Sequence, residues 1–161
     1  VFRMTKGGKL IEGIFKGATI NTPSMLCVED AIDALRWMEG LGGRDALVAR
    51  SRDNLACLAA WVEKTPWVGF LAADAASRSS TSVCFKIEDP WFTALDPDAQ
   101  SAALKKLTAA LEKEDVAYDI GGYRDAPPGL RIWAGSTVEK ADLEALLPWL
   151  DWAFAETKAN A

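Results

Sequence analysis

The sequence contains no histidine and only three cysteines, Cys27, Cys57 and Cys84. Without histidine, the chain alone cannot build a Ser-His-Asp or Cys-His nucleophile pair, or a zinc site with histidine ligands. An odd number of cysteines without CxxC spacing predicts structural thiols rather than a disulfide framework. We therefore expect no metal site and a reducing, cytoplasmic location.

The chain also lacks a long apolar run and an excess of basic residues. No run approaches the roughly 20 apolar residues that span a bilayer, and no signal-peptide pattern opens the sequence. The formal net charge is −5, whereas phosphate backbones require a basic face. We therefore expect neither a membrane nor a nucleic acid as a partner.

The composition that remains is typical of one globular domain. The chain has 161 residues, of which 50% are hydrophobic and 25% are charged. A domain of this size buries roughly 68–70% of its unfolded surface, so it needs no metal or disulfide to fold. Because the sequence opens at Val1 rather than at a methionine, we expect a piece of a longer protein.

Helical spacing of apolar residues predicts four helices, at about 23–40, 45–63, 96–115 and 137–158. In the first helix, Thr22 is the predicted N-cap and Pro23 the first helical residue. Pro148 predicts a kink or a break in the last helix. The second helix is expected to bury one apolar stripe, formed by Leu47, Val48, Leu55, Leu58 and Val62.

Four short segments, at 67–71, 81–89, 116–120 and 130–135, carry strand patterns. In the second of these, Val83, Phe85 and Ile87 alternate with Cys84 and Lys86. Strands mixed with helices on this scale predict an α+β fold, with helices covering one face of a largely antiparallel sheet of about four strands. Residues 1–20 are irregular, and the boundary of the domain is expected near residue 20.

The step Asn21-Thr22-Pro23 is the first candidate site. A helix start can bind an anion, because its first N–H groups lack intrahelical partners and its dipole is positive there. The side chains could instead serve only as a helix cap. By contrast, "TKGGKL" is not a P-loop, since the required earlier glycine and the Ser or Thr after the lysine are missing.

The second candidate site is "GGYRDAPPGLRIW". If Leu130 and Ile132 point into the core, Arg131 and Trp133 share the opposite face of their strand. Arg131 there could bind a carboxylate with its rigid fork, or it could be a surface arginine stacked on Trp133 near an acid such as Asp125. Arg124 lies in the turn just before this strand.

Three stretches, "KGGKLIEGIFKGATINTPSM", "TSVCFKIEDPWF" and "YRDAPPGLRIWAGSTVEKADLEALLPWLDWAF", together resemble the C-terminal part of the phosphoserine aminotransferase family. These are class V aminotransferases that use pyridoxal phosphate and have the aspartate-aminotransferase-type fold. The resemblance implies a cytoplasmic homodimer of serine biosynthesis, which moves an amino group between glutamate and 3-phosphohydroxypyruvate. It also implies that residues 1–20 are a tail of a large cofactor domain and that 21–161 form the small C-terminal domain.

The resemblance assigns roles by matching motifs. Asn21 and Thr22 match an Asn-Thr pair that reaches the cofactor phosphate of the neighbouring subunit. Arg131 matches the arginine of a Gly-x-Arg step and would bind the substrate carboxylate. Arg124 matches an upstream arginine, with a looser fit, and would bind the substrate phosphate.

The lysine that carries the cofactor in this family has no counterpart here, and Lys6, Lys9 and Lys16 do not stand in its context. The fragment alone is therefore expected to be inactive, to contain no catalytic residue and to bind no cofactor. Its partners would be the missing large domain, a second subunit, and the substrates phosphoserine and glutamate. The alternatives are the C-terminal domain of another class V aminotransferase, or a separate α+β module that binds a small anion.

Overall fold

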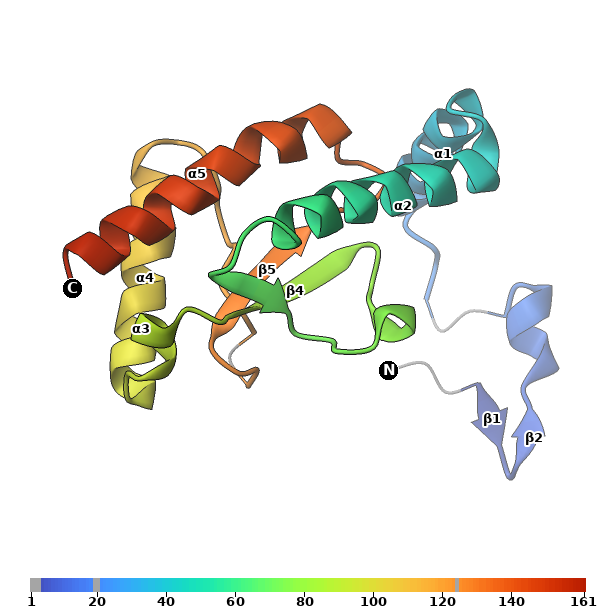
Figure 1. Cartoon of the computed structure of the whole chain (residues 1–161). Coiled ribbons are helices and arrows are strands. Elements are labelled where there is room, and N and C mark those ends of the chain that lie inside the picture. The colour runs from blue at the N-terminus through green and yellow to red at the C-terminus, as the bar shows by residue number, and fades with distance from the viewer. Residues whose placement is uncertain (1–3, 19–20, 124) are drawn as a thin grey trace. The chain divides into compact units, whose positions relative to one another are not determined.

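The computed structural model describes residues 4–18, 21–123 and 125–161. The chain divides into two compact units, Val1–Gly43 and Arg44–Ala161, and each is described by itself (Figure 1). This division falls further along the chain than the boundary expected near residue 20. The assignment of residues 1–20 to a different domain stays a prediction.

The first unit consists of a small hairpin, a 3₁₀ turn and one long helix. Strands β1 (Thr5–Lys6) and β2 (Lys9–Leu10) pair antiparallel. The turn η1 spans Glu12–Lys16, and the helix α1 spans Met25–Gly40. The predicted helix at about 23–40 is therefore present.

Helix α1 begins two residues later than predicted, and Ser24 is its N-cap. The Ser24 hydroxyl accepts a hydrogen bond from the backbone N–H of Cys27 at 3.4 Å. The prediction of Thr22 as the cap with Pro23 as the first helical residue is wrong. Serine and threonine are both preferred N-caps, and proline suits the first helical position, so Pro23 favoured Thr22 over Ser24.

None of the described residues of the first unit is buried. On α1, Leu26 is 73% exposed, and other large apolar side chains are also exposed. These are Met25, Val28, Leu35 and Trp37. Because most helical stability in proteins comes from packing of an apolar face, this helix presents apolar surface that its own unit does not cover.

The second unit begins its regular structure with helix α2 (Gly43–Val62), at the boundary with the first unit, and ends it with helix α5 (Lys140–Ala159) (Figure 1). Between these helices lie three strands and two further helices, with a 3₁₀ turn between the first two strands. They are β3 (Val68–Phe70), η2 (Ala75–Ser77), β4 (Ser82–Ile87), α3 (Pro90–Thr93), α4 (Pro97–Lys113) and β5 (Gly129–Trp133).

The sheet of this unit has the order β3-β4-β5, and both pairs are antiparallel. The predicted strand at 116–120 is not formed, and only an isolated bridge joins Gly121 to Leu130. The backbone of Asp119 has φ 52°, which lies outside the extended region that a strand requires. The α+β class with an antiparallel sheet is confirmed, with three strands rather than four.

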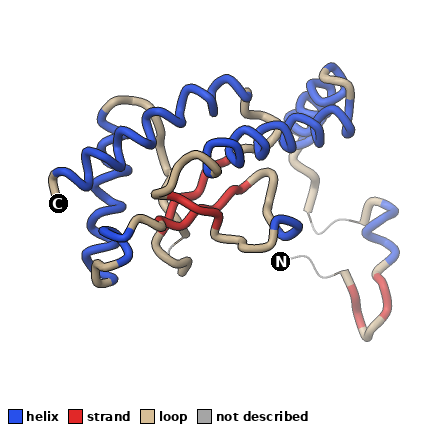
Figure 2. The backbone as a smooth tube through the Cα atoms, viewed as in Figure 1, coloured by secondary structure: helices blue, strands red, loops and turns tan. Residues whose placement is uncertain are grey.

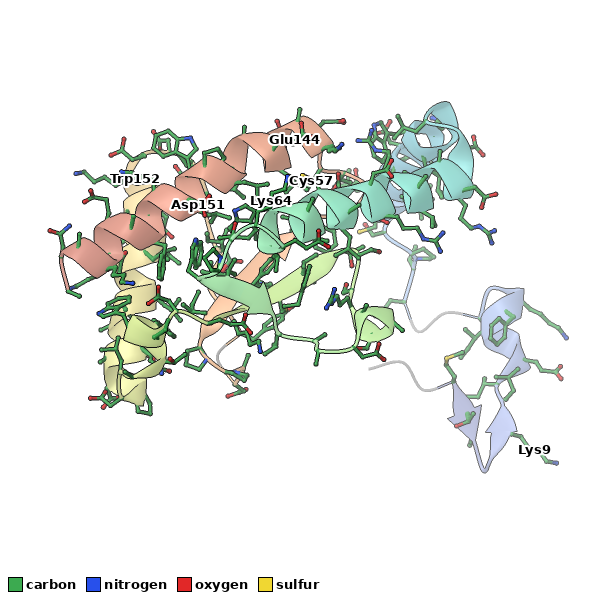
Figure 3. The ribbon with its side chains drawn as sticks, viewed as in Figure 1. Lys9, Cys57, Lys64, Glu144, Asp151 and Trp152 are labelled. Atoms are coloured by element: carbon green, nitrogen blue, oxygen red, sulfur yellow. The ribbon has the colours of Figure 1, made fainter. Side chains whose placement is uncertain are left out.

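One face of the sheet forms the core, and helices α2 and α5 pack on it (Figure 2). The ring of Trp61 on α2 contacts Phe85 on β4 edge-on, with centroids 5.9 Å apart. Trp67 stacks on Phe154 of α5 at 4.3 Å. The indole N–H groups of Trp61 and Trp67 both donate to the carboxylate of Asp151 on α5 (Figure 3), the latter at 2.9 Å.

The buried face of α2 differs from the predicted one. Its buried residues are Ser51, Asn54, Leu58 and Trp61, whereas Val48, predicted inside, is 39% exposed. The Asn54 amide, only 1% exposed, donates to the backbone oxygens of Ala134, Gly135 and Val138 at 3.1, 3.3 and 3.0 Å. A polar side chain can be buried there because its donors are satisfied by the chain that follows β5.

Helices α4 and α5 follow the sequence patterns closely. The Asp96 carboxylate caps α4 by accepting the N–H of Ala99 at 2.8 Å, and Pro97 is the first helical residue. Helix α5 runs without a break through Pro148, so the option of a break there is wrong.

Candidate functional site

The face of the sheet opposite the core carries the side chains of Arg131 and Trp133. Leu130 and Ile132 are 1% and 3% exposed, as the alternation predicts. Across the sheet, Arg131 pairs with Cys84 and Trp133 with Ser82. The side chain of Arg131 is 23% exposed, so its positive charge is accessible but partly removed from water.

Two residues hold the Arg131 guanidinium. Its Nη2 donates to Oδ2 of Asp119 at 2.9 Å, and its Cζ lies 4.4 Å from the centre of the Tyr123 ring. The acid is therefore Asp119 rather than Asp125, and the stacked ring is Tyr123 rather than Trp133. The Trp133 indole N–H donates instead to the hydroxyl of Thr137 at 3.3 Å.

Sequence reasoning missed both partners of Arg131. Asp119 was expected inside a regular strand, where its side chain would follow the alternation of that strand. Its left-handed backbone instead forms a bend ahead of the Gly121 bridge, and aspartate belongs to the residue types that tolerate this conformation. The available signal was an Asp two residues ahead of a Gly pair, which is typical of a turn rather than of a strand.

The register of β5 depends on a close approach at its first residue. A Cβ added to Gly129 would lie 2.0 Å from the carbonyl oxygen of Phe85 on β4. Any other residue would therefore push the two strands apart at the point where they pair. The glycine of the Gly-x-Arg step is thus required by packing, two residues before Arg131.

The charge of Arg131 acts on Tyr123. The interaction of the phenol with the guanidinium, and then with Ser82, lowers the pKa of Tyr123 below its usual value. The only other tyrosine, Tyr118, donates to the carboxylate of Asp115, and this bond raises the pKa of Tyr118. The pKa values of the two tyrosines are therefore shifted in opposite directions.

An ultraviolet titration of the phenols should consequently show two separate steps, one on each side of the ordinary phenol value of about 10. Tyr123 ionises first because Arg131 stabilises its phenolate, whereas ionised Tyr118 would face the Asp115 carboxylate. In Arg131→Met, the step at lower pH, which belongs to Tyr123, should move to higher pH, while the step of Tyr118 stays at the same pH. A single unresolved transition in the wild-type chain would contradict this assignment.

A hollow of about 280 Å³ opens at one end of β3 and β4. Ser82 and Cys84 line it, and these are the residues that pair with Trp133 and Arg131 across the sheet. Arg78 also lines the hollow, with its Cζ 4.0 Å above the Phe70 ring. This part of the sheet therefore combines a cationic surface with room for a small molecule.

Arg124, predicted to bind a substrate phosphate, lies outside the described residues. The described residues of its loop line a second hollow of about 290 Å³ together with helix α4. Tyr123 and Pro127 contribute to its wall from the loop, and Lys105 contributes from the helix. The role of Arg124 stays a prediction.

Asn21 and Thr22 belong to the first unit and precede the cap of α1. Both residues are exposed, just ahead of a helix start. Their predicted contact with a cofactor phosphate stays a prediction.

The other reactive groups of the described residues do not form a second centre. Burial, and after it the negative charge of Glu144, raise the pKa of the Cys57 thiol, which disfavours the thiolate that a nucleophile requires (Figure 3). Within the described ranges, no group of three acidic or cysteine side chains could hold a metal ion. In the same ranges, no helix has the length and apolar character needed to cross a membrane.

Known proteins that are similar to this chain include phosphoserine aminotransferases. The chain is 54% identical over 154 residues to the phosphoserine aminotransferase of Methanosarcina barkeri, and 53% identical over the same length to that of Methanosarcina mazei. Each match covers 96% of this chain. The chain matches the C-terminal part of the phosphoserine aminotransferases. It spans 39% of the length of these two relatives, and no protein-family model matches it.

Solved phosphoserine aminotransferases share the fold. The enzyme from Bacillus circulans subsp. alkalophilus superposes with a TM-score of 0.69 at 19% identity, over 89% of this chain and 36% of that one. A phosphoserine aminotransferase studied for radiation damage of its Schiff base gives a TM-score of 0.67 at 20% identity, over 92% and 37%. At this identity, the likeness shows the fold of the phosphoserine aminotransferase C-terminal region.

Proposed function

We propose that the chain is the domain that binds the substrate carboxylate in a phosphoserine aminotransferase. The complete enzyme would exchange an amino group between glutamate and 3-phosphohydroxypyruvate, as a cytoplasmic homodimer in serine biosynthesis. The observation that carries the proposal is Arg131, held on the open face of the sheet in a chain that is 54% identical to a phosphoserine aminotransferase.

Arg131 would bind both substrates in the same way. Glutamate and phosphoserine each carry an α-carboxylate, and a guanidinium offers two parallel N–H donors that match a carboxylate. The ring of Tyr123 restrains the plane of the guanidinium. The side chain therefore loses little orientational freedom when a ligand binds. One arginine would therefore serve both halves of the exchange.

Pyridoxal phosphate would supply the electron sink that amino transfer needs. This chain offers the cofactor only part of a site, namely the exposed residues Asn21 and Thr22, whose side chains carry an amide and a hydroxyl. Such donors suit the phosphate of the cofactor rather than its ring. We propose that they contact the cofactor of the neighbouring subunit, and that the large domain supplies the lysine.

Arg124 would hold the phosphate of phosphoserine. A second cation is needed only if the substrate carries a second anion, so this residue would separate phosphoserine from other amino acids. The same reasoning distinguishes the proposed enzyme from another class V aminotransferase, which would have no use for Arg124.

A hybrid enzyme tests the proposal. In this hybrid, the matched segment of the Methanosarcina barkeri relative is replaced by the present chain. We expect the hybrid to bind pyridoxal phosphate and to transfer the amino group of phosphoserine to 2-oxoglutarate, whereas the chain alone does neither. A folded hybrid that acts on other amino acids but not on phosphoserine would overturn the proposal.

A further inference from the structure

We propose that Asp119 is a built-in carboxylate that occupies Arg131 when no ligand is bound, and that a substrate carboxylate replaces it. The inference rests on the proposed role of Arg131 in binding carboxylates. It adds an internal competitor to that site, so Asp119 would set the affinity of the site.

The two side chains of this contact differ in their exposure to solvent. Nη2 of Arg131 donates both to Oδ2 of Asp119, at 2.9 Å, and to its backbone oxygen, at 3.4 Å. The side chain of Asp119 is 92% exposed, whereas that of Arg131 is 23% exposed. The Arg131 side chain is therefore largely covered by its neighbours, while the Asp119 carboxylate remains solvated and can be exchanged.

Within the part of the chain that the structure describes, Asp119 has no second partner that would retain it. Among the described residues, its carboxylate has no hydrogen bond or ion pair other than the one to Arg131. An exposed ion pair contributes little to stability. The carboxylate can therefore leave Arg131 and return to water at low cost.

The Arg131 guanidinium has supports other than Asp119. The Tyr123 ring lies against its face, and the backbone N–H of Arg131 donates to the oxygen of Ile120 at 2.8 Å. On the other side, β5 is paired with β4 through Cys84. Loss of the Asp119 charge should leave the Arg131 guanidinium in place, with its N–H donors accessible to an external carboxylate.

Asp119→Asn isolates the charge from the shape of the turn. Asp119 has φ 52°, in the left-handed region that both aspartate and asparagine tolerate. The substitution therefore keeps the backbone and the size of the side chain. Asp115 offers a matched control, because it is an exposed aspartate with φ 55° that contacts Tyr118 instead of Arg131.

The test is a titration of the chain with sodium acetate at constant ionic strength, followed by NMR through the side-chain N–H of Arg131. We expect Asp119→Asn to lower the apparent Kd for acetate about two- to fivefold, the range that the loss of one exposed competing ion pair implies. Asp115→Asn should leave the Kd unchanged. In the hybrid enzyme, the KM for glutamate should fall by a similar factor.

The outcomes separate this inference from the proposed function. If Arg131 responds to acetate but Asp119→Asn weakens binding or leaves it unchanged, Asp119 is not a competitor and the inference fails alone. If the Arg131 signal does not respond to acetate in the wild-type chain or in Asp119→Asn, Arg131 is not a carboxylate site, and both proposals fall. A Kd that falls equally in Asp115→Asn would show a general charge effect and would also overturn the inference.

Discussion

Replacing Arg131 by methionine in the hybrid enzyme should lower kcat/KM about 100-fold for glutamate and for phosphoserine alike. Hydrogen bonds to charged groups contribute about 1.5–3 kcal/mol, and the upper part of this range corresponds to that factor. Methionine keeps the unbranched apolar stem of the side chain but removes every donor. Because both substrates present the same carboxylate, the two losses should agree.

Lys86→Met is the matched control for this substitution. Lys86 lies on β4, on the same open face, and its ammonium pairs with Glu88 at 2.8 Å. It carries the same charge as Arg131 but has no role in the proposed site. Activity should stay within about twofold of the unsubstituted hybrid. A large loss for only one of the two substrates in Arg131→Met would contradict a shared carboxylate site.

Asn54→Asp should destabilise the fold by about 3 kcal/mol or more at neutral pH. The amide of Asn54 is buried and donates to three backbone oxygens. A carboxylate there would face the same oxygens with no proton to donate, and a buried charge without a partner costs several kcal/mol. Urea unfolding followed by tryptophan fluorescence measures the difference.

The pH dependence of this variant has a definite sign. Burial and the three carbonyl oxygens would raise the pKa of the new carboxyl in the folded state above its value in the unfolded chain. The loss of stability relative to the wild type should therefore be smallest below about pH 4, the pKa of the carboxyl in the unfolded chain. It should grow as the pH rises above that value. The control is Asp53→Asn, at the exposed position of α2 directly before Asn54. This substitution should change the stability by less than about 0.5 kcal/mol. An Asn54→Asp chain as stable as the wild type at neutral pH would show that the three hydrogen bonds do not hold α2 in place.

Local patterns predicted the parts of the fold that depend on neighbouring residues. The alternation of Leu130 and Ile132 placed Arg131 on the open face, and the apolar spacing at about 96–115 located α4. The predicted buried stripe of α2 failed at Asn54, because its partners lie at least 80 residues away in sequence. No local pattern encodes such distant partners, so the predicted buried stripe did not include Asn54.

The candidate site was predictable to the same extent. The charged residue that faces solvent could be read from the strand, but the residues that hold it could not. Asp119 reaches Arg131 through a left-handed backbone, and Tyr123 reaches it from a turn. Both positions are set by tertiary structure rather than by the repeat of a strand or helix.

Gly129 extends the site to a residue that contacts no ligand. Since a methyl group at this position would collide with the Phe85 carbonyl, even Gly129→Ala must displace the start of β5, and Arg131 would move with it. Such a variant would bind carboxylates poorly although its guanidinium is intact. A defect of this kind would come from misalignment of a complete binding group, and it would be mistaken for loss of the group itself unless the strand pairing were examined.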